Sequence, residues 1–439
     1  GNGSTWPGHI ALSVNKNFIK DILKTNDKRL KIILVAGTNG KTTTGKLIQT
    51  ILEKNGKKVF QNQAGANLLN GIASTLVLHS TVVGSLNSDF AILEIDENTL
   101  PLILKELTPD YLIILNLFRD QLDRYGEVNT IATKWKDALK KLSSKTKLIL
   151  NADDPQIASL AFKQNDHISK AIPIPYRKRS YDQVFYFGID SKNKAEKIQH
   201  ASDSTYCPHC GEKLIYNFVH FSHLGDWKCK KCGFKHPEKI FTLSPIYPLS
   251  GAYNEYNANA ASLVAKEIGM SEDKIKNALQ DFKPAFGRQE ILNIDGKKVQ
   301  IFLSKNPTGF NESLKTIADL NAPARHARLQ GVAGGKNLLI VLNDRIPDGR
   351  DVSWIWDVDF EDYKFKNLTI SGDRAYDMGL RIKYTQPMIH DSLFIIQDDL
   401  KKAIVLSLEK TPKSETLYIL PTYSAMLEVR KILTGKKIL

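Results

Sequence analysis

KIILVAGTNGKTTTGKLIQ, residues 31–49, predicts a strand, a glycine-containing loop and a helix in that order. The aliphatic run Ile32 to Val35 suits a strand that is buried on both faces of a parallel sheet. Gly37 and Gly40 let the backbone turn tightly, so that its N–H groups and the Lys41 ammonium can bind phosphate oxygens. The stretch therefore predicts a nucleotide-binding loop.

The loop GTNGKT is a compact variant of the P-loop, because Val35 stands where the standard pattern has glycine. Thr42 opens the expected helix with a hydroxyl placed to coordinate the Mg²⁺ that accompanies a nucleotide. The alternative is an ordinary strand-to-helix turn with an incidental lysine, which the order of strand, loop and helix disfavours. We predict that the nucleotide is bound by Gly37, Thr38, Asn39, Gly40, Lys41, Thr42 and Thr43.

The composition is that of a globular protein with more than one domain. The chain has 439 residues, of which 42% are hydrophobic and 25% charged, and this length predicts two or three domains. No apolar run approaches the roughly 18 to 20 residues of a membrane span, and the first residues do not resemble a signal peptide. We therefore expect a cytoplasmic location.

The formal net charge is +14. A charge of this sign attracts nucleic acid, an anionic membrane surface or a polyanionic substrate. Because the lysines are spread along the whole chain, we expect a generally basic surface before a dedicated binding patch.

The four cysteines form two C-x-x-C pairs, Cys207 with Cys210 and Cys229 with Cys232. This spacing is typical of a zinc ribbon, and four thiolates leave no open coordination position, so we expect a structural zinc ion. Two disulfides are disfavoured in a reducing compartment, and a redox pair would not need a second copy. We expect the nearby histidines to be surface residues and not ligands: His209, His220, His223 and His236.

Asp89 to Ile95 predicts a buried strand that ends in an acidic cluster. In proteins built on a parallel sheet, ligands bind at the carboxyl ends of the strands. Glu94 is therefore the expected partner of Thr42 in binding Mg²⁺. Asp96 and Glu97 suit metal binding and capping of the following helix about equally well.

Further strands are expected at residues 111–115 and 147–150, each followed by a polar turn. Strands that alternate with helices predict an α/β fold with a parallel sheet. A later helix begins after Leu249 and presents Asn254 and Asn257, whose amides can pair with a purine edge. For Asn254, helix capping is almost as good an explanation.

Pro284 and Gly287 interrupt the pattern and mark a hinge before a new strand. We place a first domain at residues 1–287, interrupted by the ribbon at about residues 200–240. The second domain covers residues 288–439.

Several motifs together resemble the Mur ligase superfamily, ATP-dependent enzymes that join an amine to a carboxylate. They are GTNGKTT, the acid-ended strand, N-x-x-x-D-x-L-D from Asn116, NADDP from Asn151, the G-x-x-N-x-x-N helix and the hinge at Arg288. The resemblance implies ATP binding by the P-loop, Mg²⁺ binding by the threonine and glutamate, and an asparagine near adenine. Gln121 and Tyr253 stand where Mur ligases usually have histidine, so a second Mg²⁺ site is not assigned. The implied roles fall on Lys41, Thr42, Glu94, Asn257 and Arg288.

The rest of the chain resembles the MurT branch of this superfamily, through the inserted ribbon and the segments at 304–311, 342–360, 371–375 and 420–424. The resemblance implies a Mur ligase central-type parallel-sheet ATPase domain and a smaller Rossmann-like α/β C-terminal domain. It also implies ATP-dependent amidation of the D-glutamate α-carboxylate of the lipid II stem peptide, through an acyl phosphate. A GatD-like glutamine amidotransferase would supply ammonia, and the chain would act at the inner face of the membrane.

The segment from Asn343 to Glu361 places five aspartates around two tryptophans, a mixture that suits an interface better than a core. A Cys–His pair in the partner requires a carboxylate that orients the histidine, and the resemblance implies that this domain lends it. We expect Asp351 in this role, with Asp348 as second choice, and a solvated turn is the alternative. The five are Asp344, Asp348, Asp351, Asp357 and Asp359.

Two other functions fit part of these features. An amino-acid-adding ligase of the Mur or folylpolyglutamate type would use the same ATP chemistry, but it does not explain the aspartate-rich segment. A nucleic-acid-binding ATPase fits the charge and the ribbon, and it predicts affinity for DNA or RNA that falls steeply with salt. We expect no nucleic acid partner.

Overall fold

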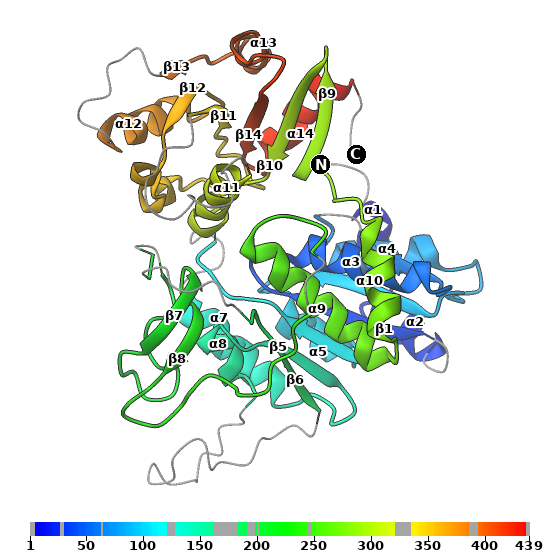
Figure 1. Cartoon of the computed structure of the whole chain (residues 1–439). Coiled ribbons are helices and arrows are strands. Elements are labelled where there is room, and N and C mark those ends of the chain that lie inside the picture. The colour runs from blue at the N-terminus through cyan, green and yellow to red at the C-terminus, as the bar shows by residue number, and fades with distance from the viewer. Residues whose placement is uncertain are drawn as a thin grey trace. The chain divides into compact units, whose positions relative to one another are not determined.

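The computed structural model divides the chain into two units, which we describe separately (Figure 1). The first comprises residues 1–118, 127–248 and 252–283, and the second comprises residues 119–126, 249–251 and 284–439. The structure describes residues 5–26, 30–62, 65–120, 128–161, 183–190, 198–199, 202–243, 247–320, 335–385 and 394–435.

The first unit is built on a six-stranded parallel sheet with the order β2-β3-β1-β4-β5-β6. The central strand β1 is buried at five of its six positions, as expected for a strand covered on both faces. It pairs with β3, so that Val35 lies opposite Glu94. The strands are β1 Lys31–Ala36, β2 Val59–Gln61, β3 Phe90–Ile95, β4 Tyr111–Ile114, β5 Lys147–Asn151 and β6 Val184–Phe187.

Helices cover both faces of this sheet (Figure 1). The helix α3 follows the P-loop and packs against α9, which begins far along the sequence. Helix α1 was not expected, and it packs closely on α4 because Gly8 has no side chain there and donates its N–H to Ser74 Oγ at 2.7 Å. The helices are α1 Trp6–Val14, α2 Phe18–Asn26, α3 Lys41–Lys54, α4 Leu69–His79, α5 Leu100–Glu106, α7 Val128–Leu139, α8 Pro155–Ser159, α9 Ala252–Ile268 and α10 Glu272–Gln280.

The cysteine-containing insertion carries an antiparallel hairpin, β7 (Ile215–Phe221) and β8 (Leu224–Lys228). Isolated bridges before and after the hairpin pair Tyr206 with Lys213 and Lys228 with Lys235. The insertion therefore has little secondary structure of its own, as expected for a ribbon that a metal ion holds together.

The second unit contains another six-stranded sheet, with the order β13-β12-β11-β14-β10-β9. Its strands are parallel except the edge strand β9, which is antiparallel to β10. The strands are β9 Arg288–Ile294, β10 Lys297–Phe302, β11 Lys336–Val341, β12 Phe365–Ser371, β13 Phe394–Ile396 and β14 Thr416–Pro421.

Both faces of this second sheet are buried. Leu338 and Ile340 of β11 face one apolar cluster, and Leu339 and Val341 face another, as the alternation of side chains along a strand requires. The helical elements are α11 Pro307–Asp319, α12 Ala375–Thr385, α13 Leu400–Lys410, α14 Tyr423–Thr434 and the 3₁₀ helices η3 Ser353–Asp357 and η4 Phe360–Asp362. These two parallel-sheet units confirm the predicted α/β fold class with its smaller Rossmann-like C-terminal part.

No helix among the described residues combines the length and the apolar composition that crossing a bilayer requires.

Candidate functional site

The P-loop connects β1 to α3 at the carboxyl edge of the first sheet. Gly40 precedes the helix with φ +90°, a left-handed conformation that glycine adopts without strain. A Cβ atom at Gly40 would lie 2.1 Å from Asn257 Oδ1. The loop therefore requires glycine here for two reasons, its backbone conformation and the close approach of α9.

Thr42 and Glu94 meet at the start of α3, where Thr42 Oγ1 donates to Glu94 Oε2 at 2.8 Å. Glu94 is only 3% exposed. Its other carboxylate oxygen accepts from Gln61 Nε2 at 2.9 Å, and its backbone N–H donates to Asn62 Oδ1 at 2.8 Å. The hydroxyl and the carboxylate are oxygen ligands of the kind that Mg²⁺ prefers. Thr42 comes from the helix that follows β1, and Glu94 comes from the neighbouring strand β3.

Lys41 lies over its own loop. Its ammonium donates to the carbonyl oxygens of Gly37 and Thr38 and lies 3.4 Å from Glu97 Oε1. The backbone of Glu97 is held from α7, because Trp135 Nε1 donates to its carbonyl oxygen at 2.8 Å. A buried acid thus helps to hold the lysine at the loop.

The third acid of the cluster, Asp96, forms hydrogen bonds within the turn that precedes α5. Its Oδ1 accepts from Asn98 N at 3.2 Å, and its carbonyl oxygen accepts from Thr99 N at 3.0 Å. Thr99 is the N-cap residue of α5. The sequence left metal binding and helix capping open for both acids, but the structure gives them different contacts. Asp96 shapes the turn before the helix, and Glu97 pairs with Lys41.

The segment after β4 fixes the other side of the loop. Asn116 accepts from Asn39 N at 2.9 Å through its side-chain oxygen and donates to Asn39 O at 3.0 Å. Thr38 Oγ1 and the backbone of Phe118 also exchange hydrogen bonds. These contacts hold residues 38 and 39 in place before any ligand arrives.

Asn257 comes to the P-loop from α9. Its Oδ1 accepts from Thr44 Oγ1 at 3.2 Å, and its Nδ2 donates to Asn254 Oδ1 at 3.3 Å. Both asparagines are buried. The structure thus brings the second asparagine of the G-x-x-N-x-x-N motif to the loop, with Thr43 buried nearby at the start of α3.

This edge of the first unit fits a nucleotide with its Mg²⁺. A glycine cradle that a Cβ would fill, a lysine at the loop and a hydroxyl–carboxylate pair are the donor set for phosphate oxygens and a hard cation. The arrangement fits the phosphate groups of a nucleoside triphosphate. Sequence reasoning missed Gln61, Asn62 and the role of Asn116. A polar residue directly after a predicted strand was the available signal.

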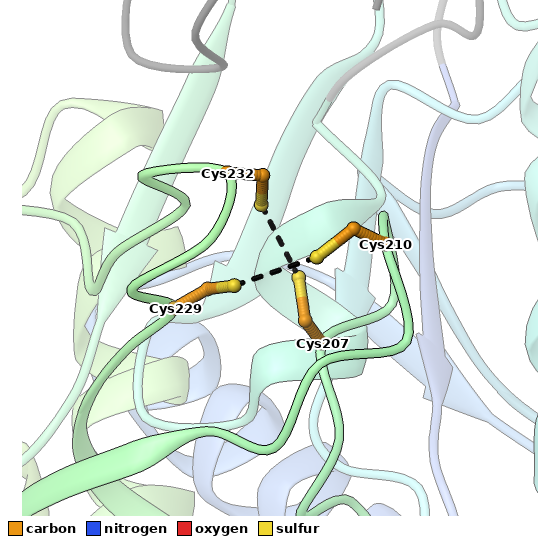
Figure 2. Close-up of side chains that lie close together, drawn as sticks. All are labelled: Cys207, Cys210, Cys229 and Cys232. Carbon is orange, nitrogen blue, oxygen red and sulfur yellow. Dashed lines mark hydrogen bonds between the residues drawn. The ribbon is translucent and has the colours of Figure 1, made fainter.

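The four cysteine thiols converge in the ribbon (Figure 2). Cys207 Sγ lies 3.5 Å from Cys232 Sγ, and Cys210 Sγ lies 3.5 Å from Cys229 Sγ. Each C-x-x-C pair is directly followed by a glycine with positive φ, +73° at Gly211 and +75° at Gly233, which lets the backbone turn tightly there to form a knuckle. Among the described residues, this is the only group of three or more candidate metal-binding side chains. The thiol set fits a tetrahedral zinc ion.

The expectation that the ribbon histidines are surface residues was wrong for two of the four. His223 is fully buried, and His220 is 8% exposed. His223 Nε2 lies 3.5 Å from Asp154 Oδ2, and His220 Nε2 lies 3.5 Å from Asp153 Oδ2. Because these aspartates follow β5, the histidines are buried where the ribbon packs on the sheet.

In the second unit, four of the five aspartates of the segment 343–361 contact residues outside that segment. Asp344 pairs with Arg374, Asp357 pairs with Arg119, and Asp359 accepts from Asn311 Nδ2 at 3.1 Å. Asp348 is 3% exposed, and it accepts from the N–H and the hydroxyl of Ser424. Burial raises the pKa of Asp348, although the Ser424 donors act against this shift. Asp348 is therefore much less accessible to another protein than an exposed carboxylate.

Asp351 is exposed at the start of the 3₁₀ segment. Its Oδ1 accepts from Ser353 N at 2.8 Å. Hydrogen bonds from the Ser353 backbone and hydroxyl hold the pKa of Asp351 below its ordinary value. Asp351 is therefore ionised at neutral pH and accessible from solvent.

Arg381 of α12 is hydrogen-bonded to the 3₁₀ segment that follows Asp351. The side chain is 5% exposed, and its guanidinium donates to the carbonyl oxygens of Ile355 at 3.3 Å and Val358 at 2.6 Å. It also donates to Glu361 Oε1 at 2.8 Å. The segment that carries Asp351 is thus tied to the body of the second unit.

Arg288 is the first residue of β9 and belongs to the second unit. Its assignment to nucleotide binding stays a prediction. Gln121, which stands where Mur ligases usually have histidine, lies outside the described residues.

Two family models match the chain. The Mur ligase middle domain matches residues 35–265, and the MurT ligase C-terminal matches residues 303–426. The first covers the P-loop, Glu94, the four cysteines and Asn257, and the second covers the aspartate-rich segment.

Two relatives are similar over nearly the whole chain, and both are named "Lipid II isoglutaminyl synthase (glutamine-hydrolyzing) subunit MurT". The protein of Staphylococcus aureus (strain COL) is 31% identical, over 97% of this chain and 91% of the relative. That of Streptococcus pneumoniae (strain ATCC BAA-255 / R6) is 32% identical, over 100% of this chain and 94% of the relative.

Among solved structures, a pseudomurein peptide ligase type C from Methanothermus fervidus has the same fold. Its TM-score is 0.65 at 23% identity, over 95% of this chain and 81% of that chain. The two relatives and the two family models agree with one another and with the resemblance seen in the motifs. The chain therefore belongs to the MurT family of Mur ligase-like proteins.

Proposed function

We propose that this chain is the ATP-dependent ligase subunit of a lipid II isoglutaminyl synthase. It would convert the D-glutamate α-carboxylate of the lipid II stem peptide to the amide of D-isoglutamine, with ATP and Mg²⁺. The observation that carries the proposal is the buried contact between Thr42 and Glu94 beside the Lys41 loop. It occurs in a chain that is 31% identical, over almost its full length, to a protein of that name.

The reaction takes two steps in this proposal. An oxygen of the substrate carboxylate attacks the γ-phosphorus of ATP, the bond from phosphorus to the β,γ-bridging oxygen breaks, and ADP leaves with that electron pair. Ammonia then attacks the carbonyl carbon of the acyl phosphate, inorganic phosphate leaves, and the nitrogen loses a proton to give the amide. Both anions of the first step must approach each other, and this repulsion is the main barrier that the site must lower.

The residues of the first unit divide this work. Lys41 leaves Glu97 to bind the γ-phosphate oxygens and offsets their charge. Thr42 and Glu94 would hold Mg²⁺, which supplies charge neutralisation when bound. Gly40 lets the backbone approach the phosphates, and Asn257, against that glycine, lies on the side where we place the adenine. Glu94 is in turn held by Gln61 and Asn62.

Ammonia comes from a glutaminase partner of the GatD type in this proposal. A Cys–His pair in that partner requires a carboxylate to orient the histidine, and Asp351 is our candidate for it. Its exposure and its lowered pKa support this role, whereas Asp348 is buried. The four cysteines would hold a structural zinc ion. The basic chain would meet lipid II at the inner face of the membrane.

The test is a reconstituted amidation. The full chain is incubated with lipid II, ATP and Mg²⁺, with either ammonium or a GatD-type glutaminase and glutamine. Mass spectrometry should find replacement of one hydroxyl by an amino group in the stem peptide. Addition of a whole amino acid would instead identify an amino-acid-adding ligase and overturn the proposal, as would ATP hydrolysis without any change in lipid II.

A further inference from the structure

Three side chains, His236, Asp153 and Tyr256, form a hydrogen-bond network that joins the ribbon to α9. Asp153, 1% exposed, follows β5 in the NADDP motif. Its Oδ1 lies 2.7 Å from His236 Nε2 of the ribbon, and its Oδ2 accepts from Tyr256 Oη of α9 at 2.5 Å. The Asp153 carboxylate thus contacts both the ribbon, at His236 and at His220 3.5 Å from Oδ2, and α9, at Tyr256.

The position of His236, at the ribbon end of this hydrogen-bond network, depends on the cysteine knuckles. His236 N donates to Trp227 O at 2.9 Å, and the Trp227 ring packs on Phe234 with centroids 4.6 Å apart. Phe234 in turn directly follows the second knuckle, where its carbonyl oxygen accepts from Cys229 N at 2.7 Å. Because so little secondary structure holds the insertion, the position of His236 depends on the folded knuckle.

At the other end of this hydrogen-bond network, Tyr256 lies beside the proposed nucleotide-binding edge. Tyr256 directly precedes Asn257, whose Oδ1 accepts from Thr44 and lies against Gly40. A movement of the first turns of α9 that breaks the Tyr256 bond therefore also moves Asn257 at the P-loop. A second metal site does not explain the histidines, since only the cysteines bring three or more candidate ligands together among the described residues.

We propose that the zinc ribbon positions the nucleotide-binding face of α9 through His236, Asp153 and Tyr256, so that zinc and nucleotide bind cooperatively. The inference rests on the proposed nucleotide site. These three are positioning residues, since they act on the nucleotide through Asn257. Cooperativity between two sites is reciprocal, so a nucleotide that binds more tightly to the zinc-loaded chain must also strengthen zinc binding by the same factor.

The experiment measures both directions on the full chain. Nucleotide affinity is measured with Mg²⁺ and a non-hydrolysable ATP analogue by calorimetry. Zinc retention is measured by extraction with a colorimetric chelator, with and without the analogue. In the wild type, the analogue should increase the chelator concentration needed for half-extraction by about fivefold or more. Tyr256→Phe should weaken nucleotide binding by a similar factor and abolish this protection, while its zinc content stays complete.

Tyr216→Phe is the matched control. It removes a hydroxyl that donates to Ser204 O at 3.1 Å and that has no hydrogen bond to α9 among the described residues. This variant should keep the wild-type affinity and the zinc protection. A loss of coupling in both variants would show a general loosening of the ribbon and overturn the positioning role.

The outcomes separate this inference from the proposed function. If the wild type binds the analogue but the analogue leaves zinc extraction unchanged, the coupling is absent and only this inference falls. If the wild type binds no nucleotide at all, the proposed function falls and the inference with it. Should Tyr256→Phe fail to fold, the wild-type zinc extraction still decides, because it needs no variant.

Discussion

Two acid-rich segments follow strands of the two parallel sheets, and they differ in where their carboxylates lie. At the end of β3, Glu94, Asp96 and Glu97 are all buried, at 3%, 5% and 3% exposure. After β11, Asp348 is buried, whereas Asp351 is exposed. Burial of an ionised group is costly unless it is paired, so the first segment concentrates carboxylates at a cost that Lys41, Thr42 and Gln61 help to offset.

The difference indicates two kinds of site. Glu97 and Glu94 of the first segment contact Lys41 and Thr42 of the same unit, which supports the proposed binding of phosphate and a cation within the chain. The second segment leaves a carboxylate on its surface, which is an arrangement for another molecule to use. We therefore expect variants of the first segment to affect every reaction of the chain, and variants of Asp351 to affect only those that need a partner.

Lys41→Ala should have the largest effect. It removes the positive charge that offsets repulsion between phosphate and carboxylate, so amidation should fall about a hundred- to a thousandfold with ammonia and with glutamine alike. Initial rates of product formation measure this change. Lys46→Ala, one turn further along α3, is the control and should behave as the wild type, since Lys46 contacts Gln49. Equal losses in both variants would mean a general effect of charge.

Asp351→Asn should lower glutamine-dependent amidation by about a hundredfold or more, because a neutral amide no longer orients and stabilises a partner histidine. The ammonia-dependent reaction should stay unchanged. Paired rate measurements with the two nitrogen sources check this split. Asp362→Asn neutralises an exposed aspartate at the end of η4, just after this segment, as a control. Loss of both reactions in Asp351→Asn would remove the contrast between the two segments.

Asp348→Ala should act on stability. It leaves the Ser424 N–H and hydroxyl without their buried acceptor, at a cost of about 2 kcal/mol in the free energy of unfolding. Chemical denaturation measures this cost, and the activity per folded molecule should persist with either nitrogen source. If Asp348→Ala instead lost only the glutamine-dependent reaction, our assignment of the two aspartates would be reversed.

The smallest effect concerns pH. The folded-state pKa of Asp351 is lowered, so its contribution to stability is complete above the unfolded-state pKa of about 4 and is lost as the pH falls further through the folded-state value. Thermal melts of the wild type and Asp351→Asn should differ slightly at neutral pH and converge below about pH 4. A difference that grows with acidity would contradict the assigned shift.

Local motifs were enough to predict much of the geometry around the P-loop. Strand, loop and helix follow one another in the sequence, so GTNGKTT predicted its own geometry, and Glu94 followed from the rule that parallel strands end at one edge. Gln61, Asn62 and Asn116 were missed because they converge from separate strands whose order in the sheet no local pattern gives.

Burial explains where the sequence reasoning failed. His220 and His223 were taken for surface residues because polar side chains usually are, but Asp153 and Asp154 provide buried partners that are distant in the sequence. Similarly, Asp348 and Asp351 are alike in sequence, and only the contact with Ser424 of α14 distinguishes the buried carboxylate from the exposed one.

The Arg381 guanidinium beneath the 3₁₀ segment has a kinetic consequence. Its hydrogen bonds to the Ile355 and Val358 carbonyls fix the backbone near Asp351 before any partner arrives. Association with the proposed glutaminase would then lose little conformational entropy in this segment, and the surfaces could dock nearly as rigid bodies. We expect Arg381→Met to slow association and leave the chemical steps of a saturated complex unchanged, which would make this buried arginine a determinant of assembly rate.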